Sequence, residues 1–191
     1  MKPKAALLRP IRCYKVYFML ITLIIFFIVI VDQVTKHLAS LFLMGGTSST
    51  FLPGILSFRY HENPGAAWGI LQNQRWIFMI ISTIAIFLFI GYLFYTRKEK
   101  TALLFRLSLA FFIGGGIGNM IDRVRLGYVV DFLRFDFIDF PIFNVADSFI
   151  SIGAGLMVLH LLLEFLHEQR SKKINELLNL TNDDKTSDPK R

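Results

Sequence analysis

The sequence predicts an all-α membrane protein whose four transmembrane helices carry a small β-sheet and an outward flap or loop outside the bilayer. Three observations lead to this prediction. The 191-residue chain is 54% hydrophobic and only 18% charged, whereas about 25% charged residues are usual in a soluble domain. Four runs reach the ~20 mostly apolar residues that cross a bilayer. Between the first two runs, apolar and polar residues alternate with the period of a β-strand.

The first apolar run covers residues 16–34 and contains Asp32 near its end. Five basic residues precede it, as in a signal peptide. Its apolar stretch is longer and bulkier than the usual hydrophobic region of such a peptide, and no A-x-A cleavage site follows closely. We therefore interpret it as a retained first span.

The other three runs cover residues 76–95, 102–121 and 144–165. The second contains no charge. The third has Arg106 near its start, and the fourth has Asp147 near its start and Glu164 near its end. Charged side chains at the end of a span can reach the interface, so all three runs are predicted to be membrane helices.

The distribution of charge predicts the orientation. Cytoplasmic loops of membrane proteins are enriched in Lys and Arg. With both termini cytoplasmic, the inner segments hold fifteen Lys and Arg against seven acids, and the outer segments hold six against seven. The net charge of +7 is therefore a topology signal. It does not indicate a nucleic-acid partner, which needs basic residues clustered on one polar face.

The outward segment 35–75 is predicted to contain a strand. Leu56, Phe58 and Tyr60 alternate with Ser57, Arg59 and His61. Pro53-Gly54 precedes the alternation and Asn63-Pro64-Gly65 follows it, and both are turn sequences. A small extracytoplasmic sheet near the membrane surface follows, since Trp68 and Trp76 are close in sequence and indole rings favour that interface.

The outward segment 122–146 concentrates acidic residues among phenylalanines. Its aspartates, with the one just beyond it, are Asp122, Asp131, Asp136, Asp139 and Asp147. Acidic groups next to apolar surface are costly unless they are paired or solvated. An ionisable residue near a span is a functional candidate by default.

A short pattern occurs twice, as Asn119-Met-Ile-Asp122 and Asn144-Val-Ala-Asp147. The second copy starts a run, so Asn144 fits a helix N-cap with Asp147 in the first turn. The first copy ends a run, where that explanation fails. There Asn119 and Asp122 share a helix face, which favours a polar network.

The usual hydrolytic signatures are missing. The sequence contains no H-E-x-x-H, no G-x-S-x-G and no P-loop, and Gly114 with Gly118 favours close helix packing. His160 and His167 are interpreted as structural or interfacial, and the single Cys13 has no obvious base nearby. Carboxylate chemistry remains: two neighbouring aspartates share a proton, and one activates a water while the other donates to a carbonyl oxygen. The residues alone do not say which two aspartates meet.

Five motifs in order resemble the lipoprotein signal peptidases (signal peptidase II), which are bacterial inner-membrane aspartyl proteases. They are Asp32-Gln-Val-Thr-Lys36, Asn63-Pro-Gly-Ala-Ala-Trp-Gly69, Gly116-Ile-Gly-Asn-Met-Ile-Asp-Arg123, Val129-Val-Asp-Phe132 and Phe143-Asn-Val-Ala-Asp147. Each motif falls at the outer end of a predicted span or in an outward segment.

The resemblance implies that Asp131 and Asp147 form a catalytic dyad, with no metal and no cofactor. It implies site-shaping or substrate-binding roles for Asp32, Lys36, Asn63, Asn119, Asp122, Arg123 and Asn144. Structural alternatives stay open. Lys36 can pair with Asp32 one helical turn away, and Asp122 with Arg123 can lock the end of the third helix.

The resemblance further implies a substrate, a prolipoprotein whose cysteine carries a diacylglyceryl group and is cleaved just before that cysteine. Membrane lipids are the other expected partner, the chain is expected to be a monomer, and globomycin is expected to inhibit it. The phenylalanines at 132–143 suit contact with acyl chains, with packing of a short strand as the alternative. Residues 1–166 are predicted to form one peptidase domain, and the polar tail 167–191 is predicted to be disordered.

Two other classes of function remain as alternatives. A small transporter or channel would use Asp32 and Asp147 in an ion path, but it would place charges near the bilayer midplane, and these lie at the ends of spans. An assembly protein would use the polar motifs only to cap helices.

Overall fold

The computed structural model describes residues 5–65, 75–98 and 102–186. Its long helices are α1 (Ala5–Leu43), α2 (Arg75–Tyr95), α3 (Leu103–Arg125) and α4 (Val145–Thr186). Each is long and apolar enough to cross a membrane. The four-helix prediction is therefore confirmed, although α1 runs well beyond residue 34, to Leu43.

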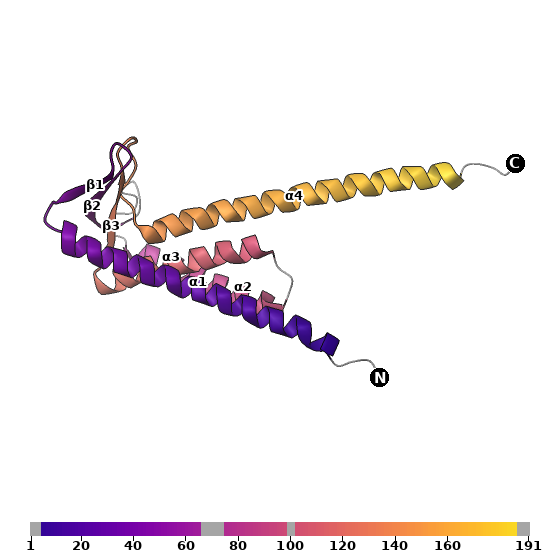
Figure 1. Cartoon of the computed structure of the whole chain (residues 1–191), viewed down its shortest axis with the longest axis horizontal. Coiled ribbons are helices and arrows are strands. Elements are labelled where there is room, and N and C mark those ends of the chain that lie inside the picture. Colours follow the sequence, from indigo (N-terminus) through magenta and orange to yellow (C-terminus); the bar gives the residue numbers. More distant parts are fainter. Residues whose placement is uncertain (1–4, 66–74, 99–101, 187–191) are drawn as a thin grey trace.

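A three-stranded antiparallel sheet lies at one end of the helices, where α1 and α3 end and α4 begins (Figure 1). Its strands are β1 (Ser48–Leu52), β2 (Leu56–Asn63) and β3 (Val129–Phe135), in that spatial order. The predicted small sheet is confirmed, with β2 at the predicted alternation. The described start of α1 and end of α4 lie at the opposite end of the molecule (Figure 1).

The sheet is tied to the helices by apolar packing. Phe132 of β3 is buried against Ala39 and Leu43 in the last turns of α1, and Phe58 and Tyr60 of β2 pack beside them. The pairing of β2 with β3 shifts register between Phe58 and His61. This bulge sets the pairing of His61 with Asp131, and bulges commonly redirect side chains next to functional sites.

Helix α3 is central, because it packs against α1, α2 and α4. Glycines let these helices approach. A methyl group on Gly114 would meet the side chain of Ile28 of α1 at 2.9 Å, and one on Gly118 would meet Asp32 Oδ2 at 2.5 Å. On Gly115 it would meet the carbonyl oxygen of Ala146 of α4 at 2.5 Å. The close packing predicted from the glycine spacing is confirmed.

Replacing Gly115 with alanine is expected to lower the thermal unfolding temperature of the purified protein. The new methyl group must push the first turn of α4 away, and overpacking of this kind costs about 1–3 kcal/mol. The matched control is Gly155→Ala, since a methyl group there meets nothing within 4 Å. Equal unfolding temperatures for the two variants would contradict the proposed role of the glycine.

Arg106 differs from its sequence-based interpretation. The sequence predicts that this side chain reaches the interface, but only 5% of the residue is exposed. Its Nη2 donates to the carbonyl oxygen of Thr96 at 2.7 Å, in the short 3₁₀ helix η2 (Thr96–Lys98) that follows α2. Arg106 thus satisfies a carbonyl at the end of the α2 segment, where helix carbonyls lack partners.

The two histidines of α4 lie far from the sheet, as a structural role requires. His160 is buried beside the ring of Phe105, at a centroid distance of 5.3 Å, and its Nε2 lies 3.5 Å from Glu164. His167 is exposed.

The tail after residue 166 also differs from the prediction of disorder, because α4 continues to Thr186. No Gly or Pro occurs between Gly155 and Thr186, and Glu168 pairs with Lys172 one turn later at 2.7 Å. Such pairs support an exposed helix. The side chain of Cys13, the indole of Trp68 and residues 187–191 lie outside the described part of the structure.

Candidate active site

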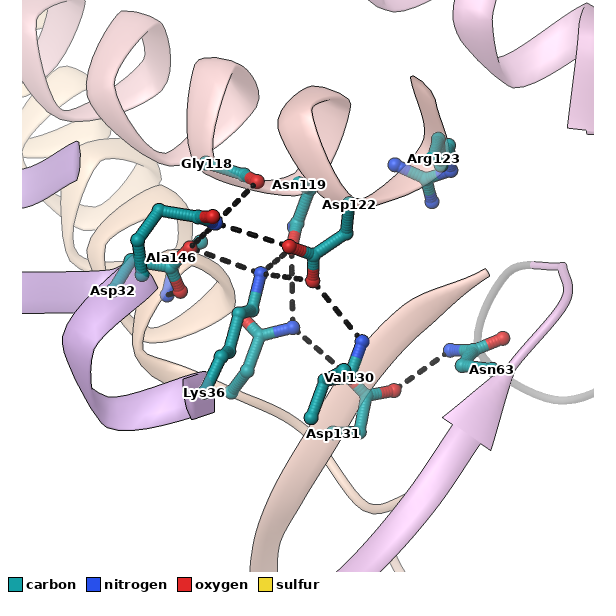
Figure 2. A network of polar contacts seen from close by, with 12 residues as sticks. Asp32, Lys36, Asn63, Gly118, Asn119, Asp122, Arg123, Val130, Asp131 and Ala146 are labelled. Carbon is teal, nitrogen blue, oxygen red and sulfur yellow. Dashed lines mark hydrogen bonds and ion pairs between the residues drawn. The ribbon is translucent and has the colours of Figure 1, made fainter. Parts of the chain in front are cut away.

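The structure brings the nine candidate residues to the junction of α1, α3, the sheet and the start of α4, and Figure 2 labels all of them except Asn144 and Asp147. These nine residues are Asp32, Lys36, Asn63, Asn119, Asp122, Arg123, Asp131, Asn144 and Asp147. Hydrogen bonds and ion pairs join all of them except Arg123 into one network.

Lys36 is the charged centre of this network. Its Nζ lies 2.9 Å from Asp32 Oδ2 and 3.0 Å from Asp122 Oδ2, and it donates to Asn119 Oδ1 at 2.8 Å. Only 3% of the residue is exposed. The predicted Lys36–Asp32 pair within α1 is confirmed, but Lys36 also binds α3. An ammonium with three donors is thereby fully satisfied.

The two carboxylates bound to Lys36 also hold backbone groups of other segments. Asp32 Oδ1 accepts the N–H of Ala146 at 2.9 Å, and Asp122 Oδ2 accepts the N–H of Val130 at 3.1 Å. Ala146 directly precedes Asp147, and Val130 directly precedes Asp131. The Asp32–Lys36–Asp122 cluster therefore fixes the start of α4 and the start of β3, the two segments that carry the candidate dyad (Figure 2).

Gln33 belongs to the same cluster, and sequence reasoning gave it no role. Its Nε2 lies within hydrogen-bond distance of three oxygens: the Gly118 carbonyl at 3.1 Å, Asp122 Oδ1 at 3.0 Å and Asp32 Oδ2 at 3.2 Å. Neighbouring helix positions point about 100° apart, so spacing does not predict that Gln33 and Asp32 reach the same helix. The only sequence feature that could have indicated a role for Gln33 is its position inside the first motif, residues 32–36.

Three asparagine amides orient the two aspartates. Asn63 and Asn144 donate to the two oxygens of Asp131, at 2.8 Å to Oδ2 and 2.6 Å to Oδ1. Asn119 donates to Asp147 Oδ1 at 2.8 Å, and its own Oδ1 accepts from Asn144 at 3.1 Å. The network predicted around Asn119 is confirmed.

Asn144 also caps α4, as its position predicts. Its Oδ1 accepts the N–H of Asp147 at 2.9 Å, and its own N–H lies 3.2 Å from Asp147 Oδ2. This reciprocal arrangement is a capping box. Capping and placement in the polar network are therefore compatible at Asp147, because Oδ2 faces the cap and Oδ1 faces Asn119.

Burial makes Asp131 the unusual carboxyl of the pair. Only 1% of the residue is exposed. Burial, and next the negative charge of Asp147, raise its pKa to about 7, against the opposing effect of the two amide donors. Near neutral pH Asp131 therefore holds a proton about half of the time, which an ordinary aspartate does not.

This pKa predicts a pH-dependent stability. Because the folded protein binds the proton of Asp131 more tightly than the unfolded chain, that carboxyl destabilises the fold progressively as pH rises from about 4 to about 7. Relative to wild type, Asp131→Asn should gain stability over this window, by at most about 4 kcal/mol. Thermal unfolding in detergent at several pH values measures this. A difference between the two proteins that does not change with pH would contradict the raised pKa.

Both aspartates line a cavity of about 620 Å³. Its polar lining includes Asn63, Asn119 and Arg123 besides the dyad. Its apolar lining includes Phe135, Phe140, Phe143, Ile150 and Ile152. The phenylalanines of this region thus divide between two tasks, since Phe132 packs on α1 whereas Phe135, Phe140 and Phe143 face the cavity.

Arg123 is the cation at the cavity wall. Its charge interacts with those of Asp147, Asp131 and Asp122, while its guanidinium lies over the ring of Phe78 at 5.7 Å and its Nη2 lies 3.5 Å from the carbonyl oxygen of Gly65. It therefore connects α2 and the turn after β2 to the dyad. The structural alternative predicted for Arg123 with Asp122 was limited to stabilising the end of α3.

The arrangement suits hydrolysis by paired carboxylates. Two aspartates from different segments share one cavity, one has a raised pKa, and both accept hydrogen bonds from neutral amides. Within residues 5–65, 75–98 and 102–186, no group of three or more His, Cys, Asp or Glu side chains is arranged to hold a metal ion.

Comparison with known proteins gives one consistent result. The family model described as signal peptidase (SPase) II matches residues 24–163. A lipoprotein signal peptidase of Symbiobacterium thermophilum is 44% identical over 138 residues, which are 71% of this chain and 89% of that protein. One of Streptococcus pyogenes serotype M5 is 42% identical over 142 residues, 73% of this chain and 91% of that protein.

Solved structures agree with the sequences. Two structures of bacterial membrane enzymes, obtained by the in meso method at 2.3 and 1.9 Å resolution, align with TM-scores of 0.69 and 0.66. Their sequences are 37% and 38% identical to this chain. The alignments cover 76% and 74% of this chain, and 88% and 92% of the solved ones.

Proposed function

Since this chain belongs to the signal peptidase II family, and is therefore a membrane-embedded protease, we propose that it is an aspartyl endopeptidase acting on diacylglyceryl-modified prolipoproteins. It removes the signal peptide by cleaving just before the lipidated cysteine. Asp131 and Asp147 perform the hydrolysis without a cofactor.

One observation carries the proposal: Asp131 and Asp147 come from different segments to the wall of one cavity whose lining combines polar side chains with phenylalanines and isoleucines. A substrate with a peptide bond next to a lipidated residue likewise combines a polar part with an apolar part. Its peptide reaches the carboxyls, and its acyl chains contact Phe135, Phe140, Phe143 and the isoleucines of α4.

The raised pKa of Asp131 supports a dyad that shares one proton. The ionised carboxylate takes a proton from water, and the hydroxide forms a bond to the scissile carbonyl carbon. The protonated carboxyl donates its proton to the carbonyl oxygen. When the tetrahedral intermediate collapses, the C–N bond breaks, the cysteine nitrogen receives a proton from the dyad, and one hydroxyl of the intermediate returns its proton to the dyad. One water is consumed, and the dyad regains its single proton.

The supporting residues act through position. Asn63 and Asn144 hold Asp131, Asn119 holds Asp147, and the Asp32–Lys36–Asp122 cluster holds the two segments. Pre-positioned reacting groups lower the activation barrier because their ordering precedes the reaction.

The location follows from charge. The described chain starts and ends at the face opposite the sheet (Figure 1), and Lys and Arg are concentrated at that face. By the positive-inside rule this face is cytoplasmic. The dyad then lies at the outer surface of the bacterial cytoplasmic membrane, where exported lipoprotein precursors arrive, and the protein acts as a monomer.

The test uses purified protein in detergent with two synthetic precursor peptides that differ only in the diacylglyceryl group on the cysteine. We expect the lipidated peptide to be cut before the cysteine, as mass spectrometry of both products shows, and globomycin to block the reaction. The unlipidated peptide should remain intact. Equal cleavage of the two peptides, or cleavage elsewhere, would overturn the proposed substrate.

A further inference from the structure

Two serines in the membrane-spanning part of the cavity take no part in the proposed hydrolysis by Asp131 and Asp147. Ser82 of α2 and Ser151 of α4 both line the cavity that holds the dyad. Ser151 follows Asp147 by four residues, so it lies about 6 Å further along α4. Ser151 is therefore further from the start of α4 than Asp147, and Ser82 lies seven residues after the first residue of α2.

Within the described residues, their hydrogen bonding differs from that of most hydroxyls in the helices, although Thr83 and Ser171 also make no bond to their own helix. Most described Ser and Thr residues in the spans donate to a carbonyl oxygen of their own helix, as membrane helices commonly allow. These are Thr22, Thr35, Ser40, Thr96, Ser108 and Ser148. Within the part of the chain that the structure describes, neither Ser82 nor Ser151 makes such a bond.

Both side chains line the open cavity, where Ser82 is half-buried and Ser151 is exposed, so a group bound in the cavity can become their hydrogen-bond partner. A polar group in hydrocarbon without a hydrogen bond is costly. Among the described residues, neither serine has a hydrogen bond to the cavity wall, whose lining includes Gly116, Ile150 and Ile152, which have no polar side chains. The missing partner must accept a hydrogen bond, because a serine hydroxyl can always donate one.

The lipid of the proposed substrate contains two such acceptors. A diacylglyceryl group on a cysteine carries two ester carbonyls, which follow the Sγ atom by a few bonds and accept but never donate. They are the first polar groups of the lipid beyond the scissile bond. With the peptide bond at the dyad, they lie on the side of the cavity toward which Ser151 is displaced.

We propose that Ser82 and Ser151 donate hydrogen bonds to the ester carbonyls of the substrate lipid, so that the site recognises ester-linked chains and not only their apolar length. This inference rests on the proposed function, since it assumes a diacylglyceryl cysteine. It adds a polar specificity element, located on α2 and α4, to the apolar wall formed by the phenylalanines.

The test compares two precursor peptides in detergent micelles. One carries a diacylglyceryl cysteine, and the other carries the matched dialkylglyceryl cysteine, in which both ester carbonyls are replaced by methylenes. Wild type should cleave the diester with a kcat/KM about tenfold higher, since each hydrogen bond contributes about 0.5–1.5 kcal/mol and 1.4 kcal/mol is tenfold. The Ser82→Ala/Ser151→Ala variant should lose this preference.

The matched control is Thr83→Ala. Thr83 is the next residue of α2, but it lines a different groove, between α2 and α3, so this variant should keep the wild-type preference. Equal rates for both substrates in wild type, or a preference that persists in the double variant, would overturn the serine assignment while leaving the proposed protease activity intact. Cleavage of neither substrate by wild type would overturn the proposed function and this inference with it.

Discussion

Replacing either Asp131 or Asp147 with asparagine is expected to reduce kcat for the lipidated precursor by at least about 10³-fold, within the range that acid–base groups contribute. Asparagine keeps the shape of the side chain but can neither hold the shared proton nor accept one from water. Because the two carboxyls act as one unit, the double variant should be no slower than the slower single variant. Cleavage of the precursor by purified protein measures all three.

The control for this prediction is Asp139→Asn. Asp139 is an exposed aspartate of the same outward segment, and it does not line the cavity. It should retain full activity. The dyad variants should unfold at temperatures close to wild type below about pH 4, where the Asp131 carboxyl is mostly protonated in both the folded and the unfolded wild type. Substantial activity in either folded dyad variant would remove that residue from the catalytic assignment.

Replacing Lys36 with methionine is expected to have the largest effect on stability. Methionine fills similar volume but removes the cation between Asp32 and Asp122, whose residues are 0% and 4% exposed. Removing one partner of a buried ion pair costs about 3–5 kcal/mol, because it leaves uncompensated charge in the interior. Chemical or thermal unfolding in detergent measures the loss, and the activity of the remaining folded fraction should fall too.

The chain offers a matched control, because Lys172 pairs with Glu168 at the same one-turn spacing and at 2.7 Å. That pair is exposed, so Lys172→Met should leave stability nearly unchanged. Adding Asp32→Asn to Lys36→Met should restore part of the lost stability, since it removes one of the two unpaired charges. If Lys36→Met were as stable as Lys172→Met, the buried cluster would not hold the site together.

The sequence predicts the helices well because their signal is local. Runs of apolar residues depend only on bilayer thickness, and the alternation at Leu56, Phe58 and Tyr60 depends only on strand geometry. For the same reason the spacing within α1 predicts the Lys36–Asp32 pair. The sequence predicts the ends of the helices less well. Helix α1 continues through polar positions to Leu43 because its last turns pack under the sheet.

The site could be predicted only in part from the residues. Spacing cannot show that Asp131 and Asp147 line one cavity, because this depends on contacts of Asp32 with Ala146 and of Asp122 with Val130, between segments far apart in the chain. The motif resemblance supplied the dyad instead. Gln33 and the burial of Arg106 were missed because each depends on a partner from another segment.

The most direct test of the dyad is the origin of the oxygen in the first product. In a single turnover of the lipidated precursor in H₂¹⁸O, with enzyme in excess, direct attack by water predicts one ¹⁸O in the new carboxylate of the released signal peptide and no covalent adduct on the enzyme. A covalent peptidyl-enzyme species, or a product carboxylate whose second oxygen is ¹⁶O donated by an enzyme side chain, would contradict hydrolysis by Asp131 and Asp147 acting on water.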